Sequence, residues 1–340
     1  MKLSLDVIGY GGYFTKDNDQ LSLEDAIRRA ARFGYDAACI FAHRPLGFPM
    51  DLDKNRRQKL VDLYNELDLE VGAIVCCNNF VEANHVLVYN TEKEIMYTKQ
   101  CIDLAEDIGS KIVRVMASLW GYFSNPYADQ GYGLPAFESR SRRVSRGEDY
   151  LEAWHQVRKA LTEVAEYARD KGITLALQTH PEITNNNDDT LEMLAEVGVE
   201  SLKVGVDLPL MEGYDPDTVR QTVLKMKDVM VYSHTISLAT IKTIGGGAYG
   251  WEEVTPGSLR DPLPWEIFIA TCKEIGYDGL FSAEQCSPIV VKGHQLGTIS
   301  VVDERYVDSR NFFRKIFKKF NCYTGHKPEY VEYQAVEYAR

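Results

Sequence analysis

Residues 171–180, KGITLALQTH, contain the junction that decides the fold of this chain. A glycine closes an amphipathic helical pattern, and a short apolar segment follows directly. Glycine ends a helix readily because it adopts the left-handed backbone conformation that a side chain resists. Repetition of such a helix-to-strand junction indicates an alternating α/β fold. The junction recurs, once with a polar residue in place of the glycine, at FGYDAACIF (33–41), LDLEVGAIV (67–75), IGSKIVRVM (108–116) and IGYDGLFSA (275–283).

Outward from these junctions, hydrophobic periodicity predicts eight strands that alternate with eight helices. The strands are almost continuously apolar, which is typical of parallel strands buried on both faces. A (β/α)8 TIM barrel accounts for this pattern, whereas a doubly wound sheet is disfavoured because no GxGxxG follows the first strand. The strands are expected at 2–8, 36–41, 70–76, 111–117, 173–179, 202–207, 229–235 and 279–284. The helices are expected at 22–33, 54–67, 92–108, 150–171, 188–196, 215–226, 264–275 and 307–319, the first beginning at Ser22.

Length and composition agree with one barrel. The 340 residues divide into a barrel domain at 1–320 and a C-terminal tail at 321–340. A net charge of −12 argues against a nucleic-acid partner, which requires clustered basic residues. Seven cysteines without a CxxC pair indicate reduced thiols, and no signal peptide or membrane-spanning run is present. We therefore expect a soluble cytoplasmic protein.

Four successive strands in the second half end in groups that bind divalent metals. They are Gln178, Asp207, His234 and Glu284. The carboxyl ends of barrel strands converge at one mouth, where the active sites of this fold lie. Oxygen and imidazole ligands favour Mn²⁺, with Mg²⁺ and Co²⁺ as alternatives. Each group alone could be a core histidine, a helix cap or an ion-pair partner, but together they predict a metal site.

Further polar residues fall at the same mouth. His180 lies two residues beyond Gln178, on the same face of the strand, and is a candidate general base or an orienter of a ligand. His43 and Arg44 end the second strand and are candidates for binding substrate hydroxyls, although the nearby prolines also suit a rigid loop. Arg114 lies inside a strand and is expected to form an interior ion pair.

Three segments exceed simple connections: 118–149, 237–262 and 320–340. The first two follow carboxyl ends of strands, so they are expected to be long loops over the metal site. The first is rich in aromatic residues, and Trp120 is a candidate wall against the substrate. The last segment is expected to wrap the barrel or to pair with another subunit.

With these features the chain resembles the xylose-isomerase-like barrel superfamily over about residues 1–320. That superfamily contains sugar isomerases, keto-sugar epimerases, inosose dehydratases and the endonuclease IV group. The resemblance implies that the four strand-end groups named above bind a divalent metal and that the substrate is a sugar or glycoside. Endonuclease activity is disfavoured by the acidic charge and by too few His and Glu positions for a three-metal cluster.

The chain departs from the superfamily pattern at two points. Gln178 stands where Glu is usual, so Glu182 is an alternative ligand. Asp207 is followed by Leu208, Pro209 and Leu210, where an epimerase carries a His. Symmetric two-base epimerisation is therefore disfavoured, while proton abstraction next to a carbonyl by one base remains available.

Three strings are similar to a narrower branch, the α subunits of bacterial C-glycoside deglycosidases: GYGGYFT (9–15), HRPLGFPMDLDKNRR (43–57) and LALQTHPEIT (175–184). This resemblance implies a metal-dependent lyase that releases the aglycone of a 3-oxo C-glycoside by β-elimination. It also implies a small β subunit and a larger hetero-oligomer. A keto-sugar isomerase or epimerase with the same metal chemistry is the alternative, and a binding barrel without catalysis is a third possibility.

Overall fold

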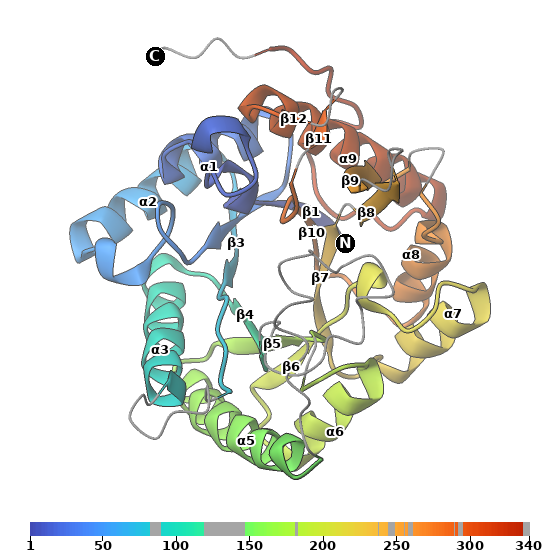
Figure 1. Cartoon of the computed structure of the whole chain (residues 1–340). Coiled ribbons are helices and arrows are strands. Elements are labelled where there is room, and N and C mark those ends of the chain that lie inside the picture. The colour runs from blue at the N-terminus through green and yellow to red at the C-terminus, as the bar shows by residue number, and fades with distance from the viewer. Residues whose placement is uncertain are drawn as a thin grey trace.

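The computed structural model describes residues 1–81, 90–118, 147–180, 183–236, 238–243, 249–254, 256–257, 261–288, 290–291 and 295–335. Its centre is a closed barrel of parallel strands in the order β1-β10-β7-β6-β5-β4-β3-β2 (Figure 1). The predicted (β/α)8 barrel is therefore confirmed. The barrel strands are β1 (Lys2–Asp6), β2 (Ala37–Phe41), β3 (Glu70–Val75), β4 (Ile112–Met116), β5 (Thr174–Gln178), β6 (Leu202–Gly205), β7 (Met230–Ile236) and β10 (Leu280–Glu284).

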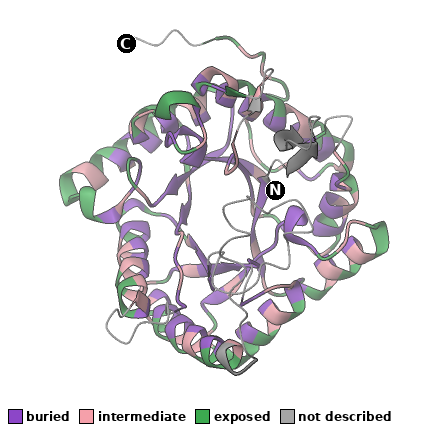
Figure 2. Ribbon diagram, viewed as in Figure 1, coloured by how far each residue is buried: buried purple, intermediate pink, exposed green. Residues whose placement is uncertain are grey.

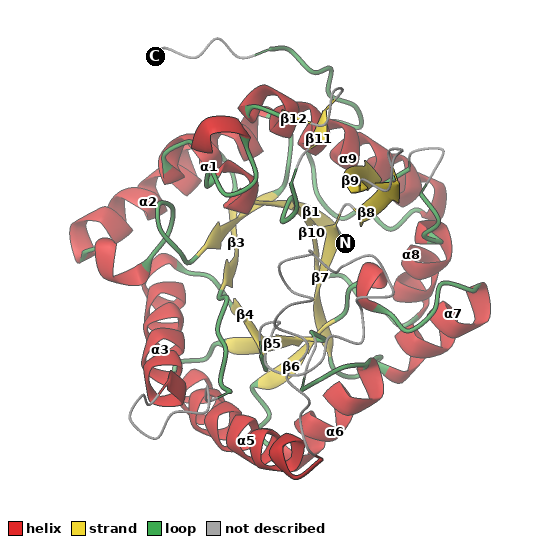
Figure 3. Ribbon diagram, viewed as in Figure 1, coloured by secondary structure: helices red, strands yellow, loops and turns green. Residues whose placement is uncertain are grey.

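Helices form a ring outside the barrel (Figure 3). The first helix begins as predicted, because the Ser22 hydroxyl accepts a hydrogen bond from the backbone N–H of Asp25 at 3.1 Å. Gly172 and Gly276 follow helices and have φ of 67° and 78°, as the junction pattern requires. The helices are α1 (Leu23–Arg32), α2 (Lys54–Glu66), α3 (Asn90–Ile108), α5 (Gly147–Asp170), α6 (Asn187–Val197), α7 (Pro216–Lys225), α8 (Trp265–Glu274) and α9 (Ile299–Phe320).

The last helix was expected at 307–319, and this start was wrong. Helix α9 begins eight residues earlier, at Ile299. Ile299, Val302 and Tyr306 are buried, and they are spaced three and four residues apart on one helical face. The intervening charged residues of this first part weakened its apolar pattern in the sequence.

The long connection expected at 237–262 contains an antiparallel hairpin, β8 (Leu238–Thr243) and β9 (Tyr249–Val254). A second short hairpin joins β11 (Val290–Val291) to β12 (Gln295–Leu296). The first hairpin follows the carboxyl end of β7 in the chain, and the second follows that of β10 (Figure 1). Most of the predicted 118–149 loop, including Trp120, lies outside the described residues.

Buried residues form the barrel and the inner faces of its helices (Figure 2). Strand β2 is buried along its whole length, which explains its uninterrupted apolar sequence. The described part of the tail packs against α9 and the N-terminal ends of the strands. The Met1 amine donates to the Cys322 carbonyl at 2.9 Å, and Asn311 donates to the Val331 carbonyl at 2.7 Å. No helix in the described part of the chain has both the length and the apolar character needed to cross a bilayer.

Candidate metal centre and substrate pocket

The four predicted ligands meet at the C-terminal mouth of the barrel. Gln178 and Glu284 are the last residues of β5 and β10, His234 lies in β7, and Asp207 follows β6. Strands β10 and β7 pair in parallel, with Ser282 of β10 opposite His234. Each of the four side chains is at least 96% buried. The structure therefore brings the four side chains named from the strand-end pattern close together.

The Nδ1 atom of His234 faces the other three groups. It lies 3.3 Å from the Gln178 amide nitrogen, 3.5 Å from Asp207 Oδ2 and 3.9 Å from Glu284 Oε2. The backbone N–H of His234 also donates to Asp207 Oδ1 at 2.6 Å, which fixes the carboxylate beside the ring. Three side chains that carry metal-binding groups thus lie within 4 Å of His234 Nδ1.

Gln178 directs its NH₂ group into this cluster, where it donates to Asp207 Oδ2 and approaches His234 Nδ1. Only its carbonyl oxygen can bind a metal ion. Rotation of the amide group by a half-turn would direct that oxygen, in place of the nitrogen, into the cluster. The alternative ligand Glu182 lies outside the described residues.

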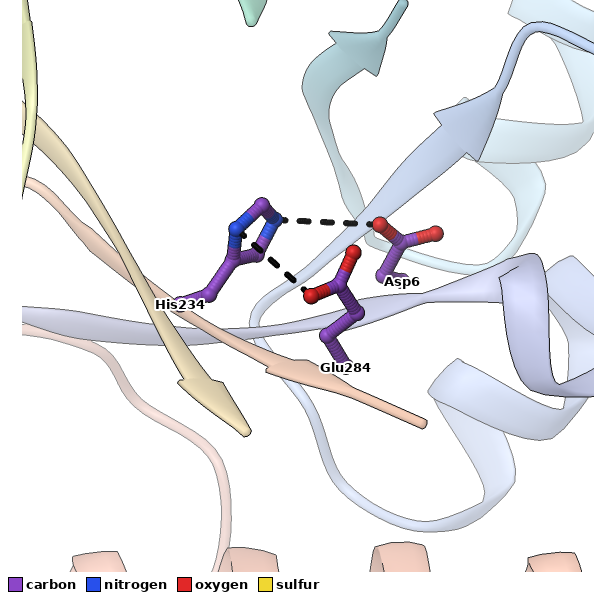
Figure 4. A group of neighbouring side chains, drawn as sticks. All are labelled: Asp6, His234 and Glu284. Atoms are coloured by element: carbon purple, nitrogen blue, oxygen red, sulfur yellow. Dashed lines mark ion pairs between the residues drawn. The ribbon is translucent and has the colours of Figure 1, made fainter. Parts of the chain in front are cut away.

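Asp6, at the end of β1, joins the cluster from the opposite side (Figure 4). Its Oδ2 lies 3.8 Å from His234 Nε2, and it groups with His234 and Glu284 closely enough to hold a metal ion. Sequence reasoning missed Asp6 because the first strand was expected to run to residue 8. The available signal was LSLD at 3–6, a short apolar run that ends in a carboxylate like the later strands.

The cluster concentrates buried negative charge. Burial and the neighbouring Glu284 carboxylate raise the pKa of Asp6 from 3.8 to about 7. Burial opposes the charged form of His234, but the carboxylates of Glu284 and Asp207 outweigh it and raise the pKa of the imidazole. Burial alone would raise the pKa of Asp207, yet His234 lowers it. A group of carboxylates that repel one another is the environment that a divalent cation stabilises.

Arg114 of β4 forms the interior ion pair that was predicted. Its guanidinium lies 3.2 Å from Glu284 Oε1, and both side chains are less than 5% exposed. It also donates to the Cys76 carbonyl at 3.3 Å. The pair leaves the other Glu284 oxygen, Oε2, directed at His234. Arg114 thereby orients the carboxylate within the cluster.

A pocket of about 400 Å³ opens above this floor. His180, His43 and Arg44 line it, so the residues proposed for catalysis and substrate binding share one cavity with Gln178 and Glu284. Arg44 is exposed and held by Asp51 at 2.6 Å, which places it at the rim. The remaining lining residues are mainly apolar: Ile8, Tyr13, Phe14, Phe41, Cys77, Met116, Leu210 and Cys286, together with Arg114.

The described part of the pocket has an aromatic wall built by segments that were not expected to supply one. The described aromatic residues of the pocket come from the segment after β1 and from β2, and Tyr13 and Phe41 pack edge to face at 5.7 Å. Phe41 also stacks on His43 at 5.1 Å. Tyr13, Phe14 and Phe41 therefore supply the aromatic lining of the described part of the pocket. Trp120, the residue predicted for this role, lies outside the described residues.

A closed parallel barrel with buried carboxylates, an imidazole and an amide at its C-terminal mouth is typical of a (β/α)8-barrel enzyme. The family model described as "Xylose isomerase-like TIM barrel" matches residues 27–316. The chain belongs to this family.

Relatives of known activity are sugar epimerases. Fructoselysine 3-epimerase of Shigella flexneri is 23% identical over 203 residues, which cover 58% of this chain and 65% of that protein. The chain thus spans less than two thirds of the length of the curated relatives it matches. Among solved structures, D-psicose 3-epimerase is similar with a TM-score of 0.65 at 14% identity, over 94% of this chain and 99% of that one. The 3-keto-D-glucoside 4-epimerase of E. coli gives 0.62 at 14% identity, over 91% and 99%. These two likenesses show the shared fold.

Proposed function

We propose that this protein is a divalent-metal-dependent enzyme that removes a proton next to the carbonyl group of a sugar derivative. The single observation that carries the proposal is the cluster of Asp207, His234 and Glu284 on the floor of a pocket that suits a small molecule. The family membership and the sugar epimerases among the relatives support a sugar as substrate.

The residues present fit a metal ion. Asp207, Glu284 and His234 Nδ1 supply three donors, Gln178 supplies a fourth after its amide turns, and the mutual repulsion of buried carboxylates gives the cluster a need for positive charge. The oxygen-rich set suits Mn²⁺, Mg²⁺ or Co²⁺. A bound divalent ion would polarise the substrate carbonyl and lower the energy of the enolate.

The remaining steps belong to the protein side chains. His180 lines the pocket on the same strand as Gln178 and is the proposed base that takes the proton from the carbon next to the carbonyl. Arg114 holds Glu284 in place through its ion pair. The apolar wall would limit the access of water to the enolate, and His43 would offer an acceptor for a substrate hydroxyl.

Return of the proton to a different position or face makes the enzyme an isomerase or epimerase. This outcome agrees best with the relatives, whose names describe epimerisation at sugar carbons. It is the reaction we favour for this chain.

A second candidate is the C-glycoside lyase, in which the enolate expels a leaving group. Gln178 favours it, because an amide cannot act as the second carboxylate base that symmetric epimerisation requires. Elimination requires one base and a pocket with room for a leaving group. The aromatic wall of Tyr13, Phe14 and Phe41 would contact a flat aglycone.

One experiment separates the two reactions. The purified chain is incubated with Mn²⁺ and either free ketohexoses or a 3-oxo C-glucoside with an aryl aglycone, and products are separated by chromatography. Rearranged sugar identifies the isomerase, and released aglycone identifies the lyase. If neither substrate class changes while the protein holds its metal, the proposed proton abstraction is wrong.

The expected small β subunit and hetero-oligomer remain predictions tied to the lyase. Co-expression of the chain with a small protein encoded beside it, followed by size-exclusion chromatography, tests them. A stable complex that alone releases aglycone supports the lyase. An active chain that elutes without a partner removes the requirement for one.

A further inference from the structure

The ring of His234 lies between two groups of polar atoms. On the Nδ1 side are Gln178, Asp207 and Glu284. On the Nε2 side are Asp6 Oδ2 at 3.8 Å and the Tyr232 hydroxyl at 3.2 Å (Figure 4). Each nitrogen of the ring thus has its own neighbours, and the two sides have different chemistry.

We propose that Asp6 is a positioning residue that keeps the proton of the neutral His234 ring on Nε2 and leaves the Nδ1 lone pair free for a metal ion. A neutral imidazole carries one proton. The hydrogen-bond partner of the nitrogen that does not bind metal, here Nε2, decides which of the two nitrogens holds that proton. A buried carboxylate beside Nε2 stabilises an N–H bond there. Its use in metal binding rests on the proposed function, whereas the placement of the proton does not.

The hydrogen-bond partners of the two Asp6 carboxylate oxygens support this role. Oδ1 accepts from the backbone N–H of Ile8 at 3.0 Å and caps the short helix that follows β1. Oδ2 is buried and has no hydrogen-bond partner among the described residues. A buried carboxylate oxygen without a donor is costly, and a small movement toward the protonated Nε2 would give it one.

The geometry favours a positioning role over direct metal ligation. Gln178, Asp207 and Glu284 lie within 4 Å of Nδ1, whereas Asp6 Oδ2 and the Tyr232 hydroxyl lie beside Nε2. Tyr232 is itself fully buried and lies 3.3 Å from Cys39 Sγ, which holds its hydroxyl beside the ring. A metal on Nε2 would have fewer ligands and would leave Asp207 and Gln178 unused.

Two variants distinguish the roles of the two Asp6 carboxylate oxygens. Asp6→Ser keeps a short oxygen that can cap the Ile8 N–H but cannot reach His234. Asp6→Asn keeps both the cap and an acceptor for Nε2. Asp36→Asn, at the other end of the barrel, is the control for loss of a buried carboxylate.

The first measurement uses metal-free protein labelled with ¹⁵N at histidine, at a pH high enough for a neutral His234 ring. The ¹⁵N shifts of this ring, assigned with His234→Gln, should report protonated Nε2 in wild type, Asp6→Asn and Asp36→Asn. In Asp6→Ser a substantial fraction should carry the proton on Nδ1. Protonated Nδ1 in wild type, or no change in Asp6→Ser, would overturn the proposal.

The second measurement is Mn²⁺ affinity by calorimetry. Asp6→Ser should bind about 10–100-fold more weakly, the usual effect of losing the partner of a metal-bound histidine, and Asp6→Asn should largely restore affinity. Equal losses in both variants with unchanged tautomer would make Asp6 a ligand and overturn the proposal. If wild type binds no divalent metal, the proposed function fails, but the tautomer measurement still decides the role of Asp6.

Discussion

Two buried aspartates, at opposite ends of the barrel, differ in how their oxygens are satisfied. Asp36, at the N-terminal end of β2, accepts from the backbone N–H of Leu3 at 2.9 Å and from the Tyr323 hydroxyl at 2.5 Å. Asp6, at the C-terminal end of β1, has a donor for one oxygen and none, among the described residues, for the other. Both oxygens of the buried carboxylate at the base thus accept hydrogen bonds, whereas one oxygen of the buried carboxylate at the mouth accepts none from the described residues.

The same contrast extends to the surroundings. At the base, polar contacts hold the tail: Arg310 donates to the Glu329 carbonyl, and Lys327 pairs with Asp68 at 2.9 Å. At the mouth, burial and the neighbouring Glu284 carboxylate raise the pKa of Asp6. In a TIM barrel the base is the stabilising end and the mouth the catalytic end. Changes at the mouth should therefore alter ligand binding, and changes at the base should alter stability.

The largest effect is expected when the buried carboxylate charges at the mouth are removed. Asp207→Asn together with Glu284→Gln keeps side-chain shape and leaves an acceptor for Arg114, but removes two charges from the metal cluster. We expect bound divalent metal to fall to background, with the circular dichroism of the folded protein retained. Metal analysis after dialysis measures this result.

The matched control at the base is Asp36→Ala. It removes the acceptor of two buried hydrogen bonds and should lower the free energy of unfolding by about 1–3 kcal/mol while metal content stays at the wild-type level. Full metal occupancy in the double variant at the mouth, or metal loss in Asp36→Ala, would break the division between the two ends.

The next largest effect concerns His180, the proposed general base. His180→Gln should lower turnover by about 10²–10⁴-fold with metal content unchanged, because proton abstraction loses its acceptor. His326→Gln, an exposed histidine beside Asp68 at the base, should leave turnover intact. A loss of activity that merely follows the loss of metal would make His180 a ligand or an orienter.

A smaller effect is expected at Gln178, where one substitution should lower the stability of the metal-free protein and raise its affinity for metal. In Gln178→Glu a further carboxylate faces Asp207, so the metal-free protein should melt at a lower temperature than wild type. With Mn²⁺ present the same variant should bind metal about tenfold more tightly, since ligand charge raises affinity. Gln285→Glu is the control, because buried Gln285 bonds to Ser287 instead.

Calorimetric titration and melting curves with and without Mn²⁺ give both quantities. Unchanged affinity in Gln178→Glu would place this side chain outside the ligand set. The two signs together distinguish a metal site from a structural cluster, because a structural cluster would only lose stability.

The sequence predicted the barrel and much of its mouth because both depend on local patterns. Apolar strands after helix ends gave the fold, and Gln178, Asp207, His234 and Glu284 were placed because strand ends converge by topology. Asp6 was missed because its strand ends two residues earlier than its apolar pattern, where the chain turns into a short helix.

Other features depend on contacts between distant segments, which periodicity does not contain. The wall built by Tyr13 and Phe41 joins a loop to a strand, and only the closed barrel brings them together. The start of α9 was missed since charged residues interrupt its buried face. The tail expected to wrap the barrel or bind a partner does contact the base, through residues such as Cys322.

The smallest effect is expected at His43, a further neutral acceptor of the mouth. Burial between Phe41 and Tyr97 lowers the pKa of His43 below 6.5, despite an opposing hydrogen bond with the Cys77 backbone. Its Nε2 has no partner among the described residues, and His43 lines the pocket, so we expect Nε2 to accept a hydrogen bond from a substrate hydroxyl. His43→Ala should raise KM about 2–10-fold with little change in kcat, the effect of one neutral hydrogen bond.

The pH dependence of KM tests whether His43 acts as an acceptor. Because the folded-state pKa of His43 lies below its ordinary value, its contribution to stability is present above pH 6.5 and is lost as the pH falls through the lowered pKa. Protonation over the same interval removes the Nε2 acceptor, so KM of wild type should rise on acidification. His43→Gln keeps an acceptor oxygen that does not titrate, and its KM should stay flatter. Parallel profiles for the two proteins would show that the titrating group of the mouth lies elsewhere, in the substrate or in the metal cluster, and that His43 serves to pack the aromatic wall.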